Sequence, residues 1–428
     1  MEKREYPALG ETLWQTTLPN GLPVLVIPRA GFSRKLAYFV TDYGAVHRRF
    51  TLNGKDWDTP AGVAHFLEHK MFDMPDGRDV MQEFARLGAS PNAFTSYDLT
   101  AYYFSCTEYF DSCLQLLLEF VSTAFFTEET VAKEQGIIGQ EIDMHADNPD
   151  SRIFEELAKS IFHRHPITVP ILGDRSSIGQ LTPEILHACH QAFYRPGNML
   201  LCVIGDVDPE AVAETARRIL PATDTAVVTR QQSWAEDMTC PRSFHSLEME
   251  VAMPMFQLGF KCEPIENGEA AVRAETVGEL AAEALMGESS ALYLRLYEEG
   301  IIDASFGGGF DTMDDMAMLC ASGDSRDPEA VRDAILEEAQ RLCREGIDEA
   351  DFLRMKRSAM GRRIRDLDGF SSTVFRVCAY RLSGFDYFDF PRIYRDIQKE
   401  DIYEFLQRVV RPERSSLCVI YPKEDTKP

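Results

Sequence analysis

Apolar and polar residues follow the same order in the two halves of the chain. In each half, two short apolar runs predict a pair of strands, and two longer stretches with apolar residues three or four apart predict helices. The predicted strands are 21–27, 35–40, 244–251 and 255–260, and the predicted helices are 112–125, 128–145, 270–287 and 327–345. Strands interleaved with long helices, without a G-x-G-x-x-G sequence after a strand, favour α+β domains over a dinucleotide-binding fold.

A short repeat supports the division into two similar halves. An Arg-Pro pair, with its proline at Pro196 and again at Pro412, is followed after four intervening residues by Leu-Cys-Val-Ile. The offset is 412 − 196 = 216 residues, about half of the 428-residue chain, which favours duplication over chance. Residues 221–242 are polar and carry a proline near each end, as is typical of a linker. We therefore predict domains over 1–220 and 243–428, joined by this linker.

The composition excludes several classes of protein. With 44 basic and 69 acidic residues the net charge is −25, so the surface should repel phosphates, and we expect neither a nucleic-acid nor a membrane partner. The same charge is compatible with basic peptide substrates. No apolar run reaches the ~18 residues of a membrane helix, and the charged N-terminus lacks the apolar core of a secretory signal. Ten scattered cysteines, several inside apolar runs, are typical of reduced, buried thiols and predict a cytoplasmic protein.

The strongest chemical signal is the sequence His65-Phe-Leu-Glu68-His69. We expect Thr59 to cap a helix with Pro60 in its first turn, on which the two histidines lie one turn apart on one face. Two imidazoles so placed can bind one zinc ion at ~2.0–2.1 Å. Glu68 borders the same face, where it can take a proton from water. This is the H-x-x-E-H order of one class of zinc peptidases, and the surrounding helix signals disfavour a coincidence of surface residues.

A third ligand is expected from another segment, because a catalytic zinc usually has three protein ligands and one water. Glu134 and Glu141 lie seven residues apart in the predicted helix 128–145, which places them two turns apart on one face. A carboxylate from this face can complete the site. The spacing alone leaves open that both are ordinary solvated helix glutamates.

Further motifs follow this site in order along the first half. They are 62–69, 88–102, Glu134, 140–142, His165-Pro166, 171–173, 194–198 and 203–207. Together they resemble the pitrilysin/insulinase family of zinc metallopeptidases, in the two-domain size class that includes mitochondrial processing peptidase subunits. The resemblance covers most of the first half of the chain.

The resemblance implies a fold, a cofactor and a set of site residues. The fold would have two homologous α+β domains, each a mainly antiparallel sheet packed with helices, facing each other around a cavity. The N-terminal domain would be the catalytic one and would bind Zn²⁺. The resemblance implies His65, His69 and Glu141 as the zinc ligands and Glu68 as the general base. It also implies that Glu134 supports the ligands from the same helix as Glu141.

The resemblance also implies a binding site for the substrate backbone. Residues Asn92, Ala93, Phe94 and Thr95 match the edge strand on which family members align a peptide. An extended peptide added to a sheet edge is held by main-chain hydrogen bonds whatever its side chains, so this role is physically reasonable. The four residues by themselves are equally consistent with an ordinary strand.

The second half departs from the family pattern. Family members with a complete site carry an Arg and a Tyr seven residues apart there. Seven residues beyond Arg295 stands Ile302, and the best-aligned aromatic residue, Phe306, has no hydroxyl. In the first half, Lys70 occupies a position at which the family more often has an apolar residue.

These observations predict a zinc-dependent endopeptidase that hydrolyses peptides or unfolded segments. The missing Arg/Tyr pair predicts a heterodimer with a related subunit that supplies it; a homodimer is the second possibility, and a local donor such as Tyr293 or Tyr297 is the alternative to a partner. A non-catalytic or assembly subunit would be expected to lose the H-x-x-E-H sequence, which is intact here. The sequence does not separate general peptide turnover from a dedicated precursor-processing role in a peptide-modification pathway.

Overall fold

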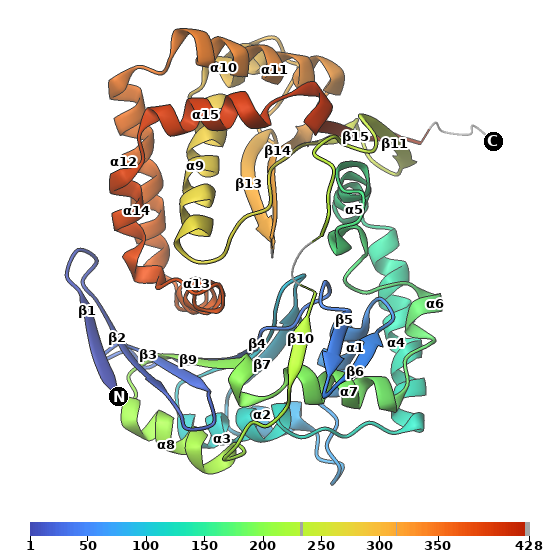
Figure 1. Ribbon diagram of the computed structural model, residues 1–428, viewed down its shortest axis with the longest axis vertical. Coiled ribbons are helices and arrows are strands. Elements are labelled where there is room, and N and C mark those ends of the chain that lie inside the picture. The colour runs from blue at the N-terminus through green and yellow to red at the C-terminus, as the bar shows by residue number, and fades with distance from the viewer. Residues whose placement is uncertain (232–233, 314, 424–428) are drawn as a thin grey trace. The chain divides into compact units, whose positions relative to one another are not determined.

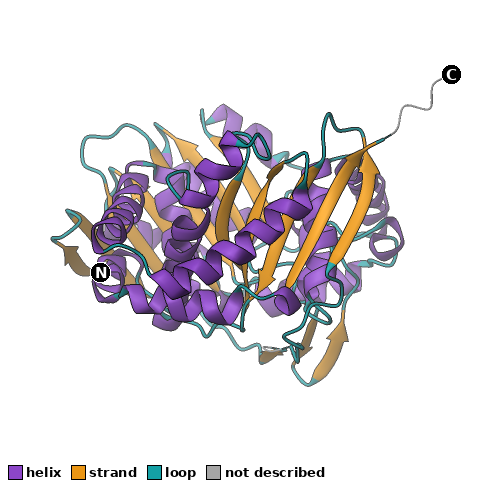
Figure 2. Ribbon diagram, turned by 90° about the horizontal axis from the view of Figure 1, so that it is seen from above, coloured by secondary structure: helices purple, strands orange, loops and turns teal. Residues whose placement is uncertain are grey.

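The computed structural model describes residues 1–231, 234–313 and 315–423, with helices and strands labelled in Figure 1. Both kinds of element are abundant (Figure 2), and the prediction of two α+β domains with mainly antiparallel sheets is confirmed. The described residues form two compact units that are discontinuous in sequence. Unit 1 contains 1–142, 169–231 and 364–389, and unit 2 contains 143–168, 234–313, 315–363 and 390–423.

Unit 1 is built on a seven-stranded sheet. In spatial order its strands are β1 (Glu2–Tyr6), β2 (Glu11–Thr17), β3 (Pro23–Pro28), β9 (Met199–Gly205), β4 (Lys35–Thr41), β8 (Thr100–Cys106) and β7 (Ser90–Thr95). All neighbours are antiparallel except β3 and β9, which are parallel. β7 therefore lies at an edge of this sheet.

Unit 2 has a five-stranded sheet with a corresponding arrangement. Its strands, in spatial order, are β11 (Phe244–Met249), β15 (Ser415–Pro422), β12 (Met255–Lys261), β14 (Met316–Asp324) and β13 (Gly307–Met313). β11 and β15 are parallel, and the remaining pairs are antiparallel.

The predicted pairing of the first two apolar runs in each half is wrong. β9 lies between β3 and β4, and β15 lies between β11 and β12. All seven residues of β9 are buried, so this apolar run belongs in the middle of the sheet, where both faces are covered. The repeated Leu-Cys-Val-Ile sequences thus mark the equivalent inserted strand of each sheet.

The helices account for the periodic segments of the sequence. They are α1 (Val63–Lys70), α2 (Val80–Arg86), α3 (Phe110–Val121), α4 (Glu128–Ala146), α5 (Pro149–Ile161), α6 (Arg175–Ile178), α7 (Pro183–Phe193), α8 (Pro209–Ile219), α9 (Glu269–Met286), α10 (Ala291–Glu298), α11 (Pro328–Glu345), α12 (Glu349–Arg365), α13 (Phe370–Leu382), α14 (Phe390–Asp396) and α15 (Lys399–Val409). α4, α9 and α11 agree closely with their predicted limits, whereas α3 ends at Val121 rather than at residue 125. Within the described part of the chain, no helix is long and apolar enough to cross a membrane.

Each unit takes one helix from the opposite half of the sequence. α5, from the first half, packs on β11, β12 and β15 of unit 2, and a Cβ atom on Gly259 would lie only 2.3 Å from Ile161 Cδ1. α13, from the second half, packs on β4 and β9 of unit 1. Glycine at position 259 therefore permits the close approach of helix and sheet in unit 2.

The predicted linker 221–242 contains ordered structure. Its residues Val228–Arg230 form β10, which joins β5 (Arg49–Leu52) and β6 (Lys55–Asp58) in a three-stranded sheet. The Arg230 guanidinium also binds the Asp42 carboxylate at 2.6 Å. Residues 232 and 233 of the linker lie outside the described residues, and the limits 1–220, 221–242 and 243–428 stay predictions.

Candidate metal centre

Helix α1 carries the H-x-x-E-H residues and is buried along nearly its whole length. Its N-terminal cap is Gly62 in the left-handed conformation (φ 86°), and a Cβ atom there would lie 2.4 Å from the Leu172 carbonyl oxygen. The expected cap at Thr59 is therefore wrong, because that hydroxyl donates to the Arg48 carbonyl oxygen at 3.0 Å. Glycine at the cap lets α1 begin against the loop at Leu172.

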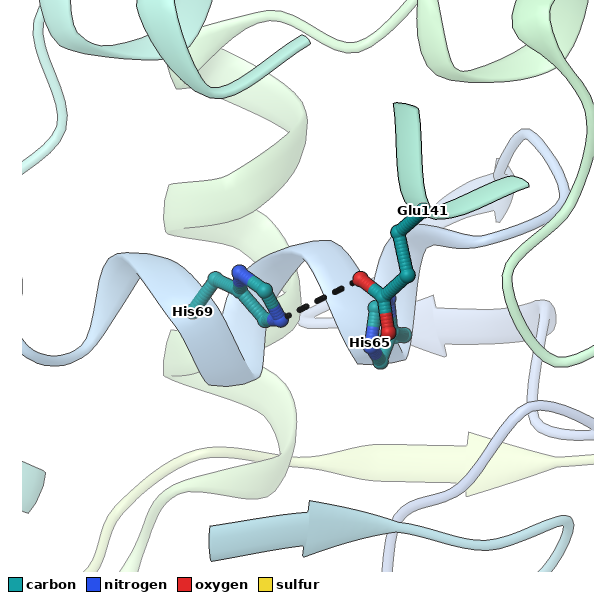
Figure 3. Close-up of side chains that lie close together, drawn as sticks. All are labelled: His65, His69 and Glu141. Atoms are coloured by element: carbon teal, nitrogen blue, oxygen red, sulfur yellow. Dashed lines mark ion pairs between the residues drawn. The ribbon is translucent and has the colours of Figure 1, made fainter. Parts of the chain in front are cut away.

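Three candidate ligands from two helices converge (Figure 3). Glu141 of α4 places Oε1 3.6 Å from His65 Nε2 and Oε2 3.7 Å from His69 Nε2. The two imidazole rings lie one helical turn apart, with centroids separated by 4.6 Å. One ligand atom from each residue lies within 4.8 Å of the others. Among the described residues, these three form the only such group of His, Cys, Asp or Glu side chains.

The donor set fits zinc. A tetrahedral zinc ion with ligands at ~2.0–2.2 Å holds those ligands about 3.3–3.6 Å apart. Each histidine Nε2 lies 3.6 or 3.7 Å from one or the other oxygen of the Glu141 carboxylate, which is close to this range. Two histidine nitrogens with one carboxylate oxygen are a donor combination found in catalytic zinc sites, where water takes the fourth position. Of the two glutamates that the spacing left open, the structure therefore places Glu141 with both histidines.

Glu134 occupies a different place, behind His69. Its Oε1 lies 2.9 Å from His69 Nδ1, the ring nitrogen that does not face Glu141. An Nδ1–H donated to this carboxylate leaves Nε2 free to bind a metal, which is the usual support of a ligating histidine. Burial alone would lower the pKa of His69, but the hydrogen bond and charge of Glu134, with the charges of Glu68 and Glu141, raise it. This cluster of carboxylates makes the centre favourable for a cation.

The carboxylate of Glu68 lies between α1 and the edge strand β7. The side chain is 8% exposed, and its Oε2 accepts a hydrogen bond from the Thr95 hydroxyl at 2.7 Å. Burial raises the pKa of Glu68, while the Thr95 hydrogen bond and the charge of His69 oppose the rise. A carboxyl group whose pKa is raised toward neutrality is suited to exchanging protons near pH 7.

The structure places the predicted substrate segment at the sheet edge. Residues 92–95 belong to β7, whose known neighbour in the sheet is β8 on one side. Asn92 is exposed, whereas Ala93, Phe94 and Thr95 are half-buried. Because the Thr95 hydroxyl contacts Glu68, the C-terminal end of this strand lies at the candidate centre.

The second-half residues that stand where a Tyr of the Arg/Tyr pair was expected lie in the interior of unit 2. Ile302 and Phe306 are both buried, and the Phe306 ring packs against Phe256 at 6.3 Å and Tyr293 at 6.0 Å. Neither side chain can donate a hydrogen bond. On the preceding helix α10, Tyr297 is exposed and stacks on Tyr293 at 5.8 Å.

Two features around Glu68 were missed in the sequence. One is the Thr95 hydroxyl, whose contact depends on which face of β7 is covered by α1. The other is a buried pair in which Tyr102 Oη and Tyr194 Oη lie 2.8 Å apart. Burial and the charge of Glu68 both raise the pKa of Tyr102, which keeps this phenol neutral. Strand alternation assigns Thr95 to one face, but only the packing of α1 reveals its partner.

Comparisons with known proteins identify the family. The insulinase family profile (peptidase family M16) matches residues 54–175, and the profile described as the peptidase M16 inactive domain matches residues 180–359. The uncharacterized zinc protease YmfH of Bacillus subtilis is 35% identical over 429 residues, covering 98% of this chain and 99% of that protein. The chain therefore belongs to peptidase family M16, which confirms the resemblance found in the sequence.

Two further comparisons extend this assignment. The crystal structure of a protein described as an M16-like peptidase, from Alicyclobacillus acidocaldarius, superposes with a TM-score of 0.91 at 31% identity, covering 96% of this chain and 99% of that one. The mitochondrial-processing peptidase subunit beta of Caenorhabditis elegans is 30% identical over 207 residues, which is 47% of this chain and 43% of that protein. The name of the second relative describes one subunit of an assembly.

Proposed function

We propose that the chain is a zinc-dependent endopeptidase with His65, His69 and Glu141 as its metal ligands and Glu68 as its general base. The observation that carries this proposal is the convergence of two Nε2 atoms and one carboxylate at 3.6 and 3.7 Å. Relatives named zinc proteases support the choice of metal and of reaction class.

Each residue of the site has a distinct role in peptide hydrolysis. Bound zinc supplies Lewis-acid chemistry, which activates water and polarises a carbonyl group. Glu68 accepts a proton from the attacking water and returns it to the departing amine. Glu134 holds the His69 ring in the tautomer that presents Nε2. The Thr95 hydroxyl holds the Glu68 carboxylate and favours its ionised form.

The substrate is an extended peptide or an unfolded segment. Residues Asn92, Ala93, Phe94 and Thr95 offer the edge of β7 to the substrate backbone, so that the peptide adds as a further strand. Thr95 links this edge to Glu68, so a peptide aligned there passes close to the general base. The net charge of −25 favours basic peptides.

Two alternative roles have less support. A purely structural or assembly subunit has no need of three ligands, a supporting carboxylate and a buried acid in one place, and all five are present. A dedicated precursor-processing role in a peptide-modification pathway would use the same chemistry and differ in substrate.

Ten free thiols, eight of them buried, support a reducing compartment such as the cytoplasm.

Zinc binding tests the ligand assignment. We expect about one zinc per wild-type chain, and replacement of His65 by alanine should abolish stoichiometric binding, because two protein ligands rarely hold a catalytic zinc. Metal analysis after dialysis measures this directly. The matched comparison is Glu134→Gln, which should weaken affinity by only ~10–100-fold, as expected for a group behind a ligand. Full zinc occupancy in His65→Ala would refute the assignment.

The pH profile tests the coupling between Thr95 and Glu68. The base must be ionised, so kcat/KM should fall as the pH drops through the raised pKa of Glu68. Thr95→Val removes a hydrogen bond that favours the ionised form, so the acidic limb of the profile should move to higher pH. Thr95→Ser keeps the hydroxyl and should retain the wild-type limb. An unchanged limb in Thr95→Val would show that this hydrogen bond does not tune the base.

A further inference from the structure

Lys70, the last residue of α1, is a buried cation next to the candidate metal centre. Its side chain is 1% exposed; Nζ forms an ion pair with Asp73 and donates to the Thr130 carbonyl oxygen at 3.3 Å. Lysine is almost never fully buried unless it is paired, because removing its charge from water is costly. An apolar side chain at this position would avoid that cost, so the two polar contacts of Lys70 call for a specific explanation.

The Thr130 contact joins α1 to the helix that carries both glutamates. His69 and Lys70 are consecutive residues of α1, and their partners in α4, Glu134 and Thr130, are four residues apart, which is one helical turn. Adjacent residues of α1 therefore contact adjacent turns of α4. Glu141 lies two further turns along the same face, opposite the two histidine Nε2 atoms.

Apolar packing provides few anchors for α4. Of its 19 residues, all of them described, Val131, Ile138 and Gly139 are buried. Ile142 is partly buried and also packs against the core. The helix is further held by polar contacts, including a hydrogen bond from Gln135 Nε2 to the Ile178 carbonyl oxygen at 3.1 Å. Apolar contacts tolerate sliding, whereas hydrogen bonds are directional. The position of α4 along α1 therefore depends on polar contacts such as the one from Lys70.

Hydrogen bonds between two threonines hold the first turn of α4 in a defined conformation. Thr127 and Thr130 cap the helix reciprocally, because the backbone N–H of each donates to the hydroxyl of the other at 3.2 Å. The Thr130 carbonyl oxygen thus belongs to a fixed turn rather than to a frayed helix end. A hydrogen-bond donor from α1 that binds this oxygen therefore holds α4 in position relative to α1.

We propose that Lys70 is a positioning residue that sets the register of α4 against α1, and so holds Glu134 and Glu141 at the two histidines. This inference rests on the proposed zinc site. Metal sites require their ligands to be held within about 0.5 Å of the productive geometry, so a small shift of α4 should weaken the site without unfolding it. Methionine, which is similar in length to lysine but has no donor, cannot make the Thr130 contact.

Zinc affinity of purified full-length variants, measured by competition with a chromophoric chelator, tests the proposal. Lys70→Met should lower zinc affinity by ~10–100-fold, the usual effect of losing a group that supports the ligands. Lys70→Arg keeps a cationic donor and should recover most of the affinity. Thermal unfolding of the metal-free proteins, measured in parallel, separates zinc affinity from stability.

Lys261 in unit 2 provides a matched control. It is also 1% exposed, and its Nζ binds the Glu236 carboxylate at 2.6 Å and two backbone carbonyl oxygens, those of Asp237 at 2.7 Å and Ile161 at 3.2 Å. Lys261→Met therefore removes the same kind of buried donor from another part of the chain. We expect it to lower the melting temperature of the metal-free protein while leaving zinc affinity unchanged.

The outcomes distinguish the positioning role from the zinc site itself. Wild-type zinc affinity in Lys70→Met, or an equal loss of affinity in Lys70→Met and Lys261→Met, would overturn the positioning role. If Lys70→Met does not fold, Lys70→Leu, which also lacks a hydrogen-bond donor, takes its place under the same criteria. Absence of zinc binding by the wild-type protein would instead refute the proposed zinc site.

Discussion

Replacing Glu68 by glutamine should leave zinc bound and remove nearly all peptidase activity. Glutamine keeps the shape of the side chain, and its amide oxygen can still accept the Thr95 hydrogen bond, but it cannot accept the proton of the attacking water. Loss of a general base typically reduces the rate by ~10²–10⁴. Turnover of an internally quenched fluorescent peptide, together with the zinc content of the same preparation, measures both parts of this expectation.

A glutamate of equal burial elsewhere provides the control for this experiment. Glu338 of α11 is also 8% exposed, and its carboxylate binds Arg341 at 2.7 Å within unit 2. Glu338→Gln should therefore affect stability at most, with turnover close to wild type. Cleavage by Glu68→Gln at the wild-type rate would show that another group takes the proton.

The sequence predicts those parts of the fold that depend on neighbouring residues, and it fails where distant segments of the chain meet. The limits of α4, α9 and α11 follow from periodicity, which is a property of each segment alone. The pairing of β3 with β4 was wrong because their common neighbour, β9, lies about 160 residues further along the chain. The exchange of α5 and α13 between the units is equally invisible in local patterns.

In the candidate centre, too, the sequence predicts the residues that share one helix but not the contacts between helices. His65, Glu68 and His69 could be placed on one helix face because their spacing matches a single turn. Whether Glu134 or Glu141 meets them depends on how α4 packs on α1, and spacing alone left this open. The contact of Lys70 with the Thr130 carbonyl was beyond sequence analysis, because a backbone acceptor leaves no pattern of side chains to detect.

The second half of the chain raises a separate question about transition-state stabilisation. Peptide hydrolysis places negative charge on the former carbonyl oxygen, and hydrogen-bond donors lower the energy of that state. Where the Tyr of the family's Arg/Tyr pair was expected, the chain has Ile302 and Phe306, which are buried apolar residues of unit 2. Loss of function by drift should degrade both halves, yet the candidate metal centre in the first half is complete. This asymmetry favours a partner that supplies the missing donors.

We therefore expect a heterodimer with a related chain of similar length that lacks H-x-x-E-H but has an Arg and a Tyr seven residues apart. Alone, this chain should bind zinc and cleave peptides slowly; co-purified with such a partner, its turnover should rise about a hundredfold or more, the scale of one oxyanion donor. Light scattering of the mixture and of each chain separates the heterodimer from a homodimer, in which the second copy would bring the same Ile302 and Phe306. Strong activity of the isolated chain, unchanged by the partner and lost in Tyr297→Phe or Tyr293→Phe, would instead assign the donor to α10 of this chain.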